Sequence, residues 1–233
     1  AAIAAAAGPP GRVATVILPA DYSWSAAQTP GELVTPATTT GSDARSGAEA
    51  ALEALRAHGR ETVLLLGGAA TTEAGLTAAA RIAAATGARM LVETFPARLR
   101  RGKGIPAVDR LGYLAEQAEQ QLTGASHLVL VGARAPVAFF AYPGKPSGLV
   151  PIGVQTHVMA PDELDGLVDQ LGAGPLSLPD TPRPELPKGP LTAANWAQVI
   201  GALLPPDAII SDEANTSGVL VPAATAGAPA HDV

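Results

Sequence analysis

The sequence contains no cysteine in 233 residues, and this absence excludes several kinds of chemistry. Without thiols, these residues hold no disulfide framework, no cysteine nucleophile and no cysteine-ligated zinc. A chain without cysteine is compatible with a reducing compartment, and we expect a cytoplasmic protein.

Basic runs and long apolar runs are also missing. With a net charge of −6 and no lysine- or arginine-rich run, the chain lacks the basic surface by which proteins bind nucleic acid or anionic membranes. Glycine, threonine and charged residues interrupt every apolar stretch before it reaches the roughly 20 residues that cross a bilayer. We therefore expect small molecules or proteins as partners, and neither nucleic acid nor membrane.

Aromatic residues are scarce at 3%, but hydrophobic residues make up 47% of the chain and charged residues only 15%. Alanine and aliphatic side chains therefore supply enough apolar surface for a folded core. This composition argues against wholesale disorder.

The most informative stretch reads ETVLLLGGAATTEAGLTAAARIAAATGARM. In it an apolar run meets Gly67 and Gly68, Thr72 follows as a candidate helix cap, and an alanine-rich helix over 72–86 ends at Gly87. A strand, a glycine turn, a polar cap and a helix in this order predict the start of a βαβ unit.

Strands and helices alternate along the middle of the chain. We expect strands over 63–66, 89–94, 127–131 and 149–152, and helices over 43–58, 72–86, 111–122 and 162–171. This alternation predicts an α/β fold, a doubly wound parallel sheet with helices on both faces. Because ligands of such sheets bind beyond the carboxyl ends of the strands, we expect a crevice there.

The flanks have a different composition. A helix over 1–7 and a buried strand over 13–18 precede a stretch rich in Thr, Pro, Gly and Ser. A proline-rich crossing over 176–190 precedes a helix over 191–204 and a buried strand over 208–210. Because neither end completes a domain, we expect the chain to be a segment of a longer polypeptide.

The turn at Gly67 and Gly68 has two interpretations. A nucleotide or phosphate can approach a glycine backbone closely, and the helix N-terminus near Thr72 offers N–H groups to an anion. The alternative is a tight strand-to-helix turn without a ligand. The turn lacks the GxGxxG spacing, and we find no acidic residue placed for a ribose.

The loop ARLRRGKGIPAV is the most basic part of the chain. Its Arg98, Arg100, Arg101 and Lys103 suit either a bound phosphate or carboxylate, or a solvated surface. The four histidines do not pair at metal-ligand spacing, so we expect no metal site among these residues.

A polar cluster from Asp212 to Ser217 follows the last expected strand. Charged and hydroxyl side chains at the end of a buried strand are costly to keep there without partners. The cluster therefore predicts either a binding turn or an ordinary capped turn.

Five stretches together resemble the thiamine-diphosphate-dependent enzymes of the acetolactate synthase large-subunit type. The opening PPGRVATVILPAD is similar to the last strand of that family's pyrimidine-binding domain, and TVLLLGGAATTEAG is similar to the start of its central domain. RGKGIPAVDRLGYL resembles its Lys-Gly-x-x-Pro loop, and HLVLVGAR resembles a later strand. LTAANWAQVIGALLPPDAIISDEANTSG resembles the beginning of its diphosphate-binding domain.

The resemblance implies a division of the chain. Residues 1–24 correspond to the end of a pyrimidine-binding domain, 25–42 to a linker and 43–175 to the central α/β domain. Residues 176–190 correspond to a second linker, and 191–233 to the start of the diphosphate-binding domain.

The resemblance also implies a chemistry and a set of binding residues. Such enzymes make or break a bond beside the carbonyl of a 2-oxo acid, with thiamine diphosphate holding the electrons. The residues implied are Glu213, Asn215, Thr216 and Ser217 for the cofactor, and Gly67, Gly68 and Arg134 for a possible nucleotide crevice.

The sequence departs from the family pattern at two places. Flavin-binding members continue after the later strand with an Arg-Phe-Asp-Asp-Arg type sequence, whereas here Ala135 and Pro136 follow Arg134, and Asp109-Arg110 stand where the family has His-Pro. Both departures argue against bound FAD and for an empty or repurposed central crevice. The family's activating glutamate and its Mg²⁺-binding Gly-Asp-Gly motif fall outside these residues, so we expect no catalytic residue and no metal ligand among them.

The activity that the resemblance implies is carboligation of pyruvate, as in acetolactate synthase. The alternatives are decarboxylation of a 2-oxo acid, as in benzoylformate decarboxylase relatives, and a non-catalytic nucleotide-binding or structural domain. Because the family builds its active sites between subunits, the resemblance also implies a homodimer or homotetramer.

Overall fold

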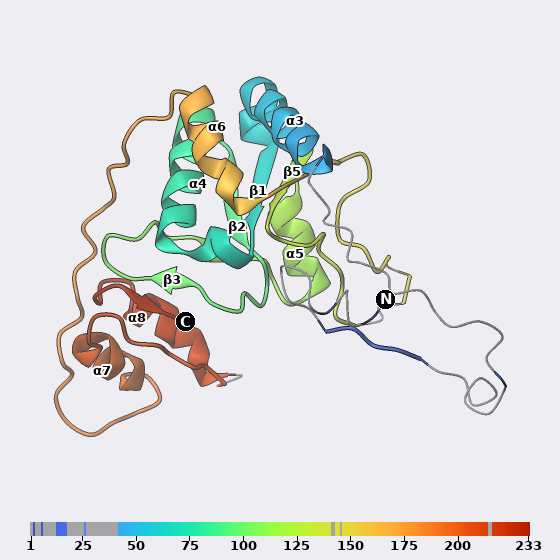
Figure 1. Cartoon of the computed structure of the whole chain (residues 1–233). Helices are drawn as coiled ribbons and strands as arrows, with labels where there is room; N and C mark the ends of the chain where they lie inside the picture. Colours follow the sequence, from blue (N-terminus) through green and yellow to red (C-terminus); the bar gives the residue numbers. More distant parts are fainter. Residues whose placement is uncertain are drawn as a thin grey trace. The chain divides into compact units, whose positions relative to one another are not determined.

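The computed structural model describes residues 42–140, 143–144, 146–213 and 216–233, together with Ala2, Ala6, 13–17 and Ala26; for 42–46 it describes only the backbone. The chain divides into two compact units, Ala1–Ser42 and Asp43–Val233. The second unit carries the sheet and both candidate sites (Figure 1).

Five parallel strands form the sheet, in the order β4-β2-β1-β5-β6. They are β1 (Thr62–Leu66), β2 (Arg89–Val92), β4 (Asp109–Arg110), β5 (His127–Val131) and β6 (Gln155–Met159). The chain winds from β1 outward to β2 and β4, then returns to the other side of β1 for β5 and β6. The predicted doubly wound parallel α/β sheet is therefore confirmed, with its switch point between β1 and β5.

Helices cover both faces of the sheet (Figure 1). On one face lie α3 (Ser42–His58), α4 (Glu73–Thr86) and α6 (Leu164–Gln170), and on the other lies α5 (Ala115–Leu122). Alternate residues of β1 point to the two layers: Leu64 and Leu66 join the core under the three helices, while Val63 and Leu65 join the core under α5. Because both faces are buried, β1 is apolar without alternation.

Local sequence sets the ends of α4 as predicted. The Thr72 hydroxyl accepts a hydrogen bond from the Gly75 N–H at 3.4 Å, which caps the first turn. Gly87 ends the helix in the left-handed region at φ 79°, and its N–H donates to the Ala83 carbonyl at 2.8 Å. Within the residues that the structure describes, four short 3-10 turns join other elements: η1 (Gly59–Glu61), η2 (Gly68–Thr71), η3 (Pro161–Glu163) and η4 (Ser217–Leu220).

The strand predicted over 149–152 is wrong, and β6 takes its place in the sheet. Leu149 donates its N–H to the Pro136 carbonyl, and Pro151 has no N–H to give to a ladder. The true strand was missed because it lies at the sheet edge, where its mostly exposed residues weaken the apolar signal.

The strand predicted over 13–18 is also not observed. Residues 13–17 form no strand, Val13 and Ile17 are 95% and 87% exposed, and Leu18 lies outside the described residues. A strand forms only against a neighbour that completes its hydrogen bonds, and none of the described residues supplies one. Of the helix predicted over 1–7, the two described residues, Ala2 and Ala6, are helical.

The C-terminal part contains α7 (Trp196–Leu203), α8 (Val221–Ala224) and β7 (His231–Asp232). The buried strand predicted over 208–210 is wrong: it is reduced to one bridge from Ile209 to Asp232, and Ile209 is 76% exposed. The segment bonds to Asp232 of β7, but Ile209 stays exposed there, so its apolar run was a misleading signal of burial.

The basic loop, residues 97–108, connects this C-terminal part to the five-stranded sheet through backbone pairing and ion pairs. β3 (Arg100–Arg101), within this basic loop, pairs antiparallel with β7. Asp232 forms ion pairs with Arg98 and Arg100, and Arg100 also meets Asp207 at 2.6 Å. The hydrogen bond from Arg98, and then the charges of both arginines, hold the pKa of Asp232 below its ordinary value. The loop's charges thus serve an internal ion-pair network.

None of the helices in the described part of the chain combines the length and apolarity needed to span a bilayer.

Replacing Asp232 by Asn is expected to lower the free energy of unfolding by about 2 kcal/mol, because it removes a buried carboxylate that pairs with both Arg98 and Arg100. The folded pKa of Asp232 is lowered, so its contribution is present at neutral pH and is lost as pH falls through that pKa. Urea unfolding at neutral pH and near pH 3 measures both effects.

The matched control is Asp180→Asn, which removes an exposed pair with Lys103 and should cost about 0.5 kcal/mol or less. Equal losses for Asp232→Asn and Asp180→Asn would contradict this role of Asp232.

Candidate functional site

A crevice of about 210 Å³ opens where the carboxyl ends of the central strands meet. Leu66, Val92 and Val131 end β1, β2 and β5 in register, so the residues that follow them lie at one edge of the sheet. This is the edge at which we expected a crevice. The lining residues are Leu65, Glu93, Thr94, Phe95, Leu111, Arg134, Ala135, Pro136, Val137 and Phe139.

The glycine turn after β1 packs backbone against backbone. The Gly67 N–H donates to the Val131 carbonyl at 2.9 Å. A Cβ on Gly67 would lie 2.9 Å from Glu93 Oε1 and 2.9 Å from the Gly132 carbonyl oxygen, distances that a real Cβ does not tolerate. Glycine is therefore required here by the close approach of the neighbouring turns.

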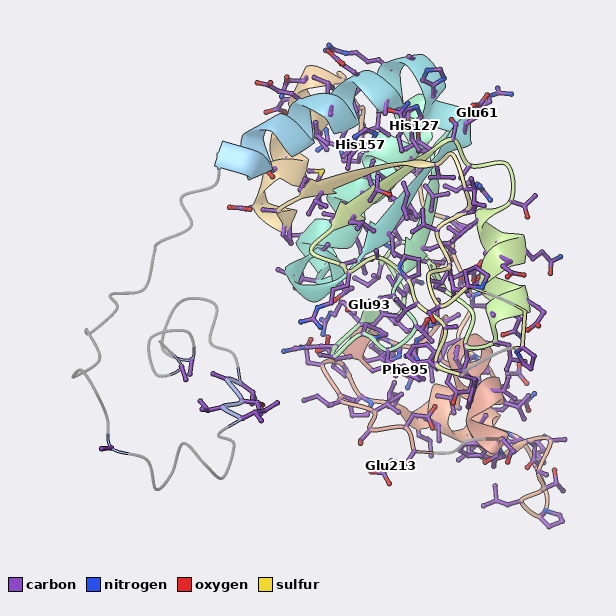
Figure 2. All side chains as sticks on the ribbon, turned by 90° about the vertical axis from the view of Figure 1, so that its right-hand side faces the viewer. Glu61, Glu93, Phe95, His127, His157 and Glu213 are labelled. Atoms are coloured by element: carbon purple, nitrogen blue, oxygen red, sulfur yellow. The ribbon has the colours of Figure 1, made fainter. Side chains whose placement is uncertain are left out.

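Glu93 is the acidic group of the crevice (Figure 2). It directly follows β2, and its N–H donates to the Leu66 carbonyl at 3.0 Å. Burial raises the pKa of the Glu93 carboxyl, while a hydrogen bond from the Gly68 N–H and the charge of Arg134 act in the opposite direction. The carboxylate thus sits against the glycine turn.

Glu93 was not identified from the sequence. An acidic residue at the end of the second strand, about 20 residues after the glycine turn, contacts the ribose in dinucleotide-binding folds, and Glu93 directly follows the second strand here, 25 residues after Gly68. That spacing was the available signal, and it was overlooked because no strand boundary had been placed directly before Glu93.

The structure brings Gly68 and Arg134 together around Glu93 and places Gly67 against Gly132. Whether these residues bind a nucleotide stays a prediction. The N-terminus of α4 is less available than expected, because η2 separates it from the glycine turn and the Thr72 side chain already caps it.

Four aromatic residues gather at the mouth of this crevice, and we call them the aromatic cluster: Phe95, Tyr113, Phe139 and Phe140. Neighbouring ring centroids lie 5.2–5.6 Å apart in edge-to-face and stacked pairs. The chain has 3 Phe, 3 Tyr and 2 Trp, so half of its aromatic residues are here. They are nevertheless 45–63% exposed. Exposed apolar side chains that gather in one patch indicate a contact site.

The polar turn after residue 211 is the second candidate site. Glu213, Thr216 and Ser217 are exposed on it, and Asn215 lies outside the described residues. The carboxylate of Asp212 lies against Gly218, where a Cβ would be 2.7 Å from both carboxylate oxygens.

A cavity of about 380 Å³ adjoins the polar turn. It is lined by Phe95, Pro96, Ala97, Arg98, Arg110, Ile209, Ile210, Ser211, Asp212, Asp232 and Val233. The cavity brings two arginines of the sheet domain beside the start of the polar turn. The cofactor role of Glu213, Thr216 and Ser217 stays a prediction.

Three of the four histidines lie together: His58 ends α3, His127 begins β5 and His157 lies in the middle of β6. His127 and His157 lie at the opposite end of the sheet from Glu93 (Figure 2). The His127 ring stacks on His58 at 4.9 Å and on His157 at 5.3 Å, and His127 Nδ1 lies 3.0 Å from His157 Nε2. Sequence spacing did not reveal this group, because its members come from α3, β5 and β6. Among the described residues, no group of His, Asp or Glu is arranged to hold a metal ion.

Comparison with known proteins gives one curated relative. No protein-family model matches the chain. A Mycobacterium tuberculosis (strain ATCC 25618 / H37Rv) protein, which carries the provisional name acetolactate synthase large subunit IlvX, is 52% identical over 232 residues. The match covers 95% of this chain and 43% of that protein, so the chain spans less than half the length of this relative. The resemblance drawn from the sequence motifs is confirmed.

Two solved structures share the fold. One is a provisionally assigned thiamin diphosphate-dependent enzyme from Mycobacterium smegmatis, with a TM-score of 0.55, 18% identity, and coverage of 81% of this chain and 41% of that chain. The other is the thiamine diphosphate-dependent 4-hydroxybenzoylformate decarboxylase of Rhodococcus jostii RHA1, with a TM-score of 0.52, 17% identity, and coverage of 85% and 41%. At these identities the likeness establishes the fold.

Replacing Gly67 by Ala is expected to destabilise the protein by about 1–3 kcal/mol, because the added methyl group displaces Glu93 or the Gly132 turn. Gly166→Ala is the control: its Cβ meets no atom within 4 Å, and alanine gains up to about 1 kcal/mol in α6. Chemical denaturation of both variants measures the difference, and a neutral Gly67→Ala would contradict the close packing.

Acid is expected to lower the free energy of unfolding through the histidines at the β5–β6 edge of the sheet. Burial and then the charge of His58 lower the pKa of His127 below 6.5, although Glu61 opposes this, while burial and then His127 lower the pKa of His157. Below about pH 6.5 the unfolded chain takes up protons that the folded imidazoles do not accept, so stability falls as pH falls through that range.

Thermal unfolding between about pH 7.5 and pH 5 measures this slope. His157→Gln should flatten part of it, whereas Thr156→Ser on the same strand should leave it unchanged. A wild-type profile that is flat over this range would show that the histidine group does not act in this way.

Proposed function

Because this chain resembles one part of a thiamine-diphosphate-dependent enzyme of the acetolactate synthase large-subunit type, we propose that it belongs to an enzyme that acts on 2-oxo acids. The reaction we propose is carboligation of pyruvate. The observation that supports it is the 52% identity, over 95% of the chain, to a protein named as such a subunit.

We propose that the polar turn faces the cofactor. When bound, thiamine diphosphate supplies an electron sink for the carbanion formed beside the substrate carbonyl. The exposed hydroxyls of Thr216 and Ser217 can donate hydrogen bonds to the cofactor, and the exposed carboxylate of Glu213 can accept one. Neither hydroxyl is hydrogen-bonded to another described residue. Asn215 completes the proposed set, and we place the ligands of Mg²⁺ outside this chain.

We further propose that a second subunit, in a homodimer or homotetramer, covers this turn. A carbanion must be shielded from water, yet Glu213, Thr216 and Ser217 are all exposed in the single chain. A closed site therefore requires further protein over them. The cytoplasm is the proposed location, since the chain has no cysteine to oxidise.

A second candidate reaction is decarboxylation of an aromatic 2-oxo acid. It is favoured by one observation: a structure that shares the fold is a 4-hydroxybenzoylformate decarboxylase. A non-catalytic nucleotide-binding or structural role is the third alternative. It would be favoured if the intact protein did not bind thiamine diphosphate.

Ser217→Ala and Glu213→Gln in the intact protein are each expected to weaken thiamine diphosphate binding about tenfold in the presence of Mg²⁺, equivalent to about 1.4 kcal/mol. Calorimetric titration measures this change. Ser177→Ala and Glu185→Gln, in the exposed proline-rich crossing, are the matched controls and should bind as the wild type does.

Turnover of pyruvate and of an aromatic 2-oxo acid by the intact protein separates the two reactions. Acetolactate formed from pyruvate supports carboligation, whereas CO₂ and an aldehyde formed from the aromatic acid support decarboxylation. If the intact protein shows no heat of binding with thiamine diphosphate and Mg²⁺, the proposed cofactor is wrong.

A further inference from the structure

We propose that the crevice beyond β1, β2 and β5 binds a small planar nitrogen heterocycle without phosphate, which stacks on the aromatic cluster and donates an N–H to Glu93. This inference rests on the crevice alone and is independent of the polar turn. It goes beyond the action on 2-oxo acids proposed above.

The glycine turn of the crevice has its N–H groups already engaged. Gly67 donates to the Val131 carbonyl, and the Gly68 N–H meets the Glu93 carboxylate. These are the groups that a phosphate would need at a glycine-rich turn. Further along, the N–H groups of Ala70 and Thr72 close η2 by donating to the carbonyls of Gly67 and Ala69.

Charge also opposes a phosphate. Glu93 Oε1 lies close enough to the turn that a Cβ on Gly67 would be 2.9 Å away, so a negative oxygen sits where a pyrophosphate would approach the backbone. The facing cation, Arg134, is exposed and already interacts with Glu93. A flavin dinucleotide, as flavin-binding members of the fold family hold, therefore does not fit the residues present.

The remaining surface of the crevice suits a flat ring. Phe95 and Phe139 line it, and Leu65, Leu111 and Val137 supply apolar walls. Exposed aromatic faces offer a stacking platform to a heterocycle. A cavity of about 210 Å³ is large enough to hold a ring-sized molecule.

The polar groups of the crevice select the edge of that ring. Glu93 accepts hydrogen bonds and Arg134 donates them, and both line the same cavity. A ring edge with an amino group beside an unprotonated nitrogen matches this pair, as aminopurines and aminopyrimidines do. A carboxylated or phosphorylated ring would bring a second negative charge to Glu93.

The test is a series with one ring and rising charge: adenosine, AMP, ADP and FAD, titrated calorimetrically into the intact protein. We expect adenosine to bind at least tenfold more tightly than AMP, with ADP and FAD weaker still. Glu93→Gln should weaken adenosine about tenfold and bring the adenosine-to-AMP ratio close to one. Glu53→Gln, on the exposed face of α3, is the matched charge control and should keep the wild-type ratio.

Phe139→Ala is a second test variant. Because the Phe139 side chain is half exposed, its removal should not disturb the packing around the glycine turn. It should weaken all four compounds by a similar factor, because it removes stacking and leaves the charge unchanged. Binding of ADP or FAD to the wild type as tight as that of adenosine would overturn the proposal. It would equally be overturned if none of the four bound, or if Glu93→Gln left the ratio as in the wild type.

Discussion

β1 is buried on both faces and paired on both edges, and the rest of the larger unit takes its position from this strand. Each residue from Val63 to Leu66 is at most 1% exposed. Burying each such side chain contributes about 1.5–3 kcal/mol, and a shift of one residue toward the crevice would bring the Leu66 side chain to the place of Gly67, where even a Cβ has no room. Register is therefore fixed, and with it the common edge at which Gly67, Glu93 and Gly132 emerge.

That common edge forces the neighbouring turns into backbone contact. Gly132 has a left-handed φ of 63°, and a Cβ on it would lie 2.7 Å from the Gly67 carbonyl oxygen. Two glycines thus face each other across the switch point, and their lack of side chains leaves room for the Glu93 carboxylate. The Gly67 N–H bonds to the Val131 carbonyl, and the Gly68 N–H bonds to Glu93. The geometry resembles a nucleotide-binding edge, but its polar groups are arranged for a different class of ligand.

The two candidate sites share one segment. Phe95 lines both the crevice and the cavity beside the polar turn, and Arg98, three residues later, forms an ion pair with Asp232. The loop that leaves β2 therefore contributes to the crevice, to the cavity and to the joint between β3 and β7. Movement of this loop would change the surroundings of both sites together.

The sequence determined the elements whose signals are local. The apolar run of β1, the cap at Thr72, the glycine stop at Gly87 and the strand from His127 to Val131 were all predicted, as was the parallel α/β class. These features depend on side-chain periodicity and on backbone preferences that neighbouring residues set. The motifs also carried the resemblance that the M. tuberculosis relative confirmed.

Tertiary structure decided what depends on distant partners. β6 became a strand because β5 offers it an edge, whereas residues 149–152 are more apolar but lack that edge. The aromatic cluster and the three stacked histidines were not found because their members come together only after the sheet has wound in both directions. Spacing along the chain carries no information about such contacts, since the crossovers between strands set which side chains meet.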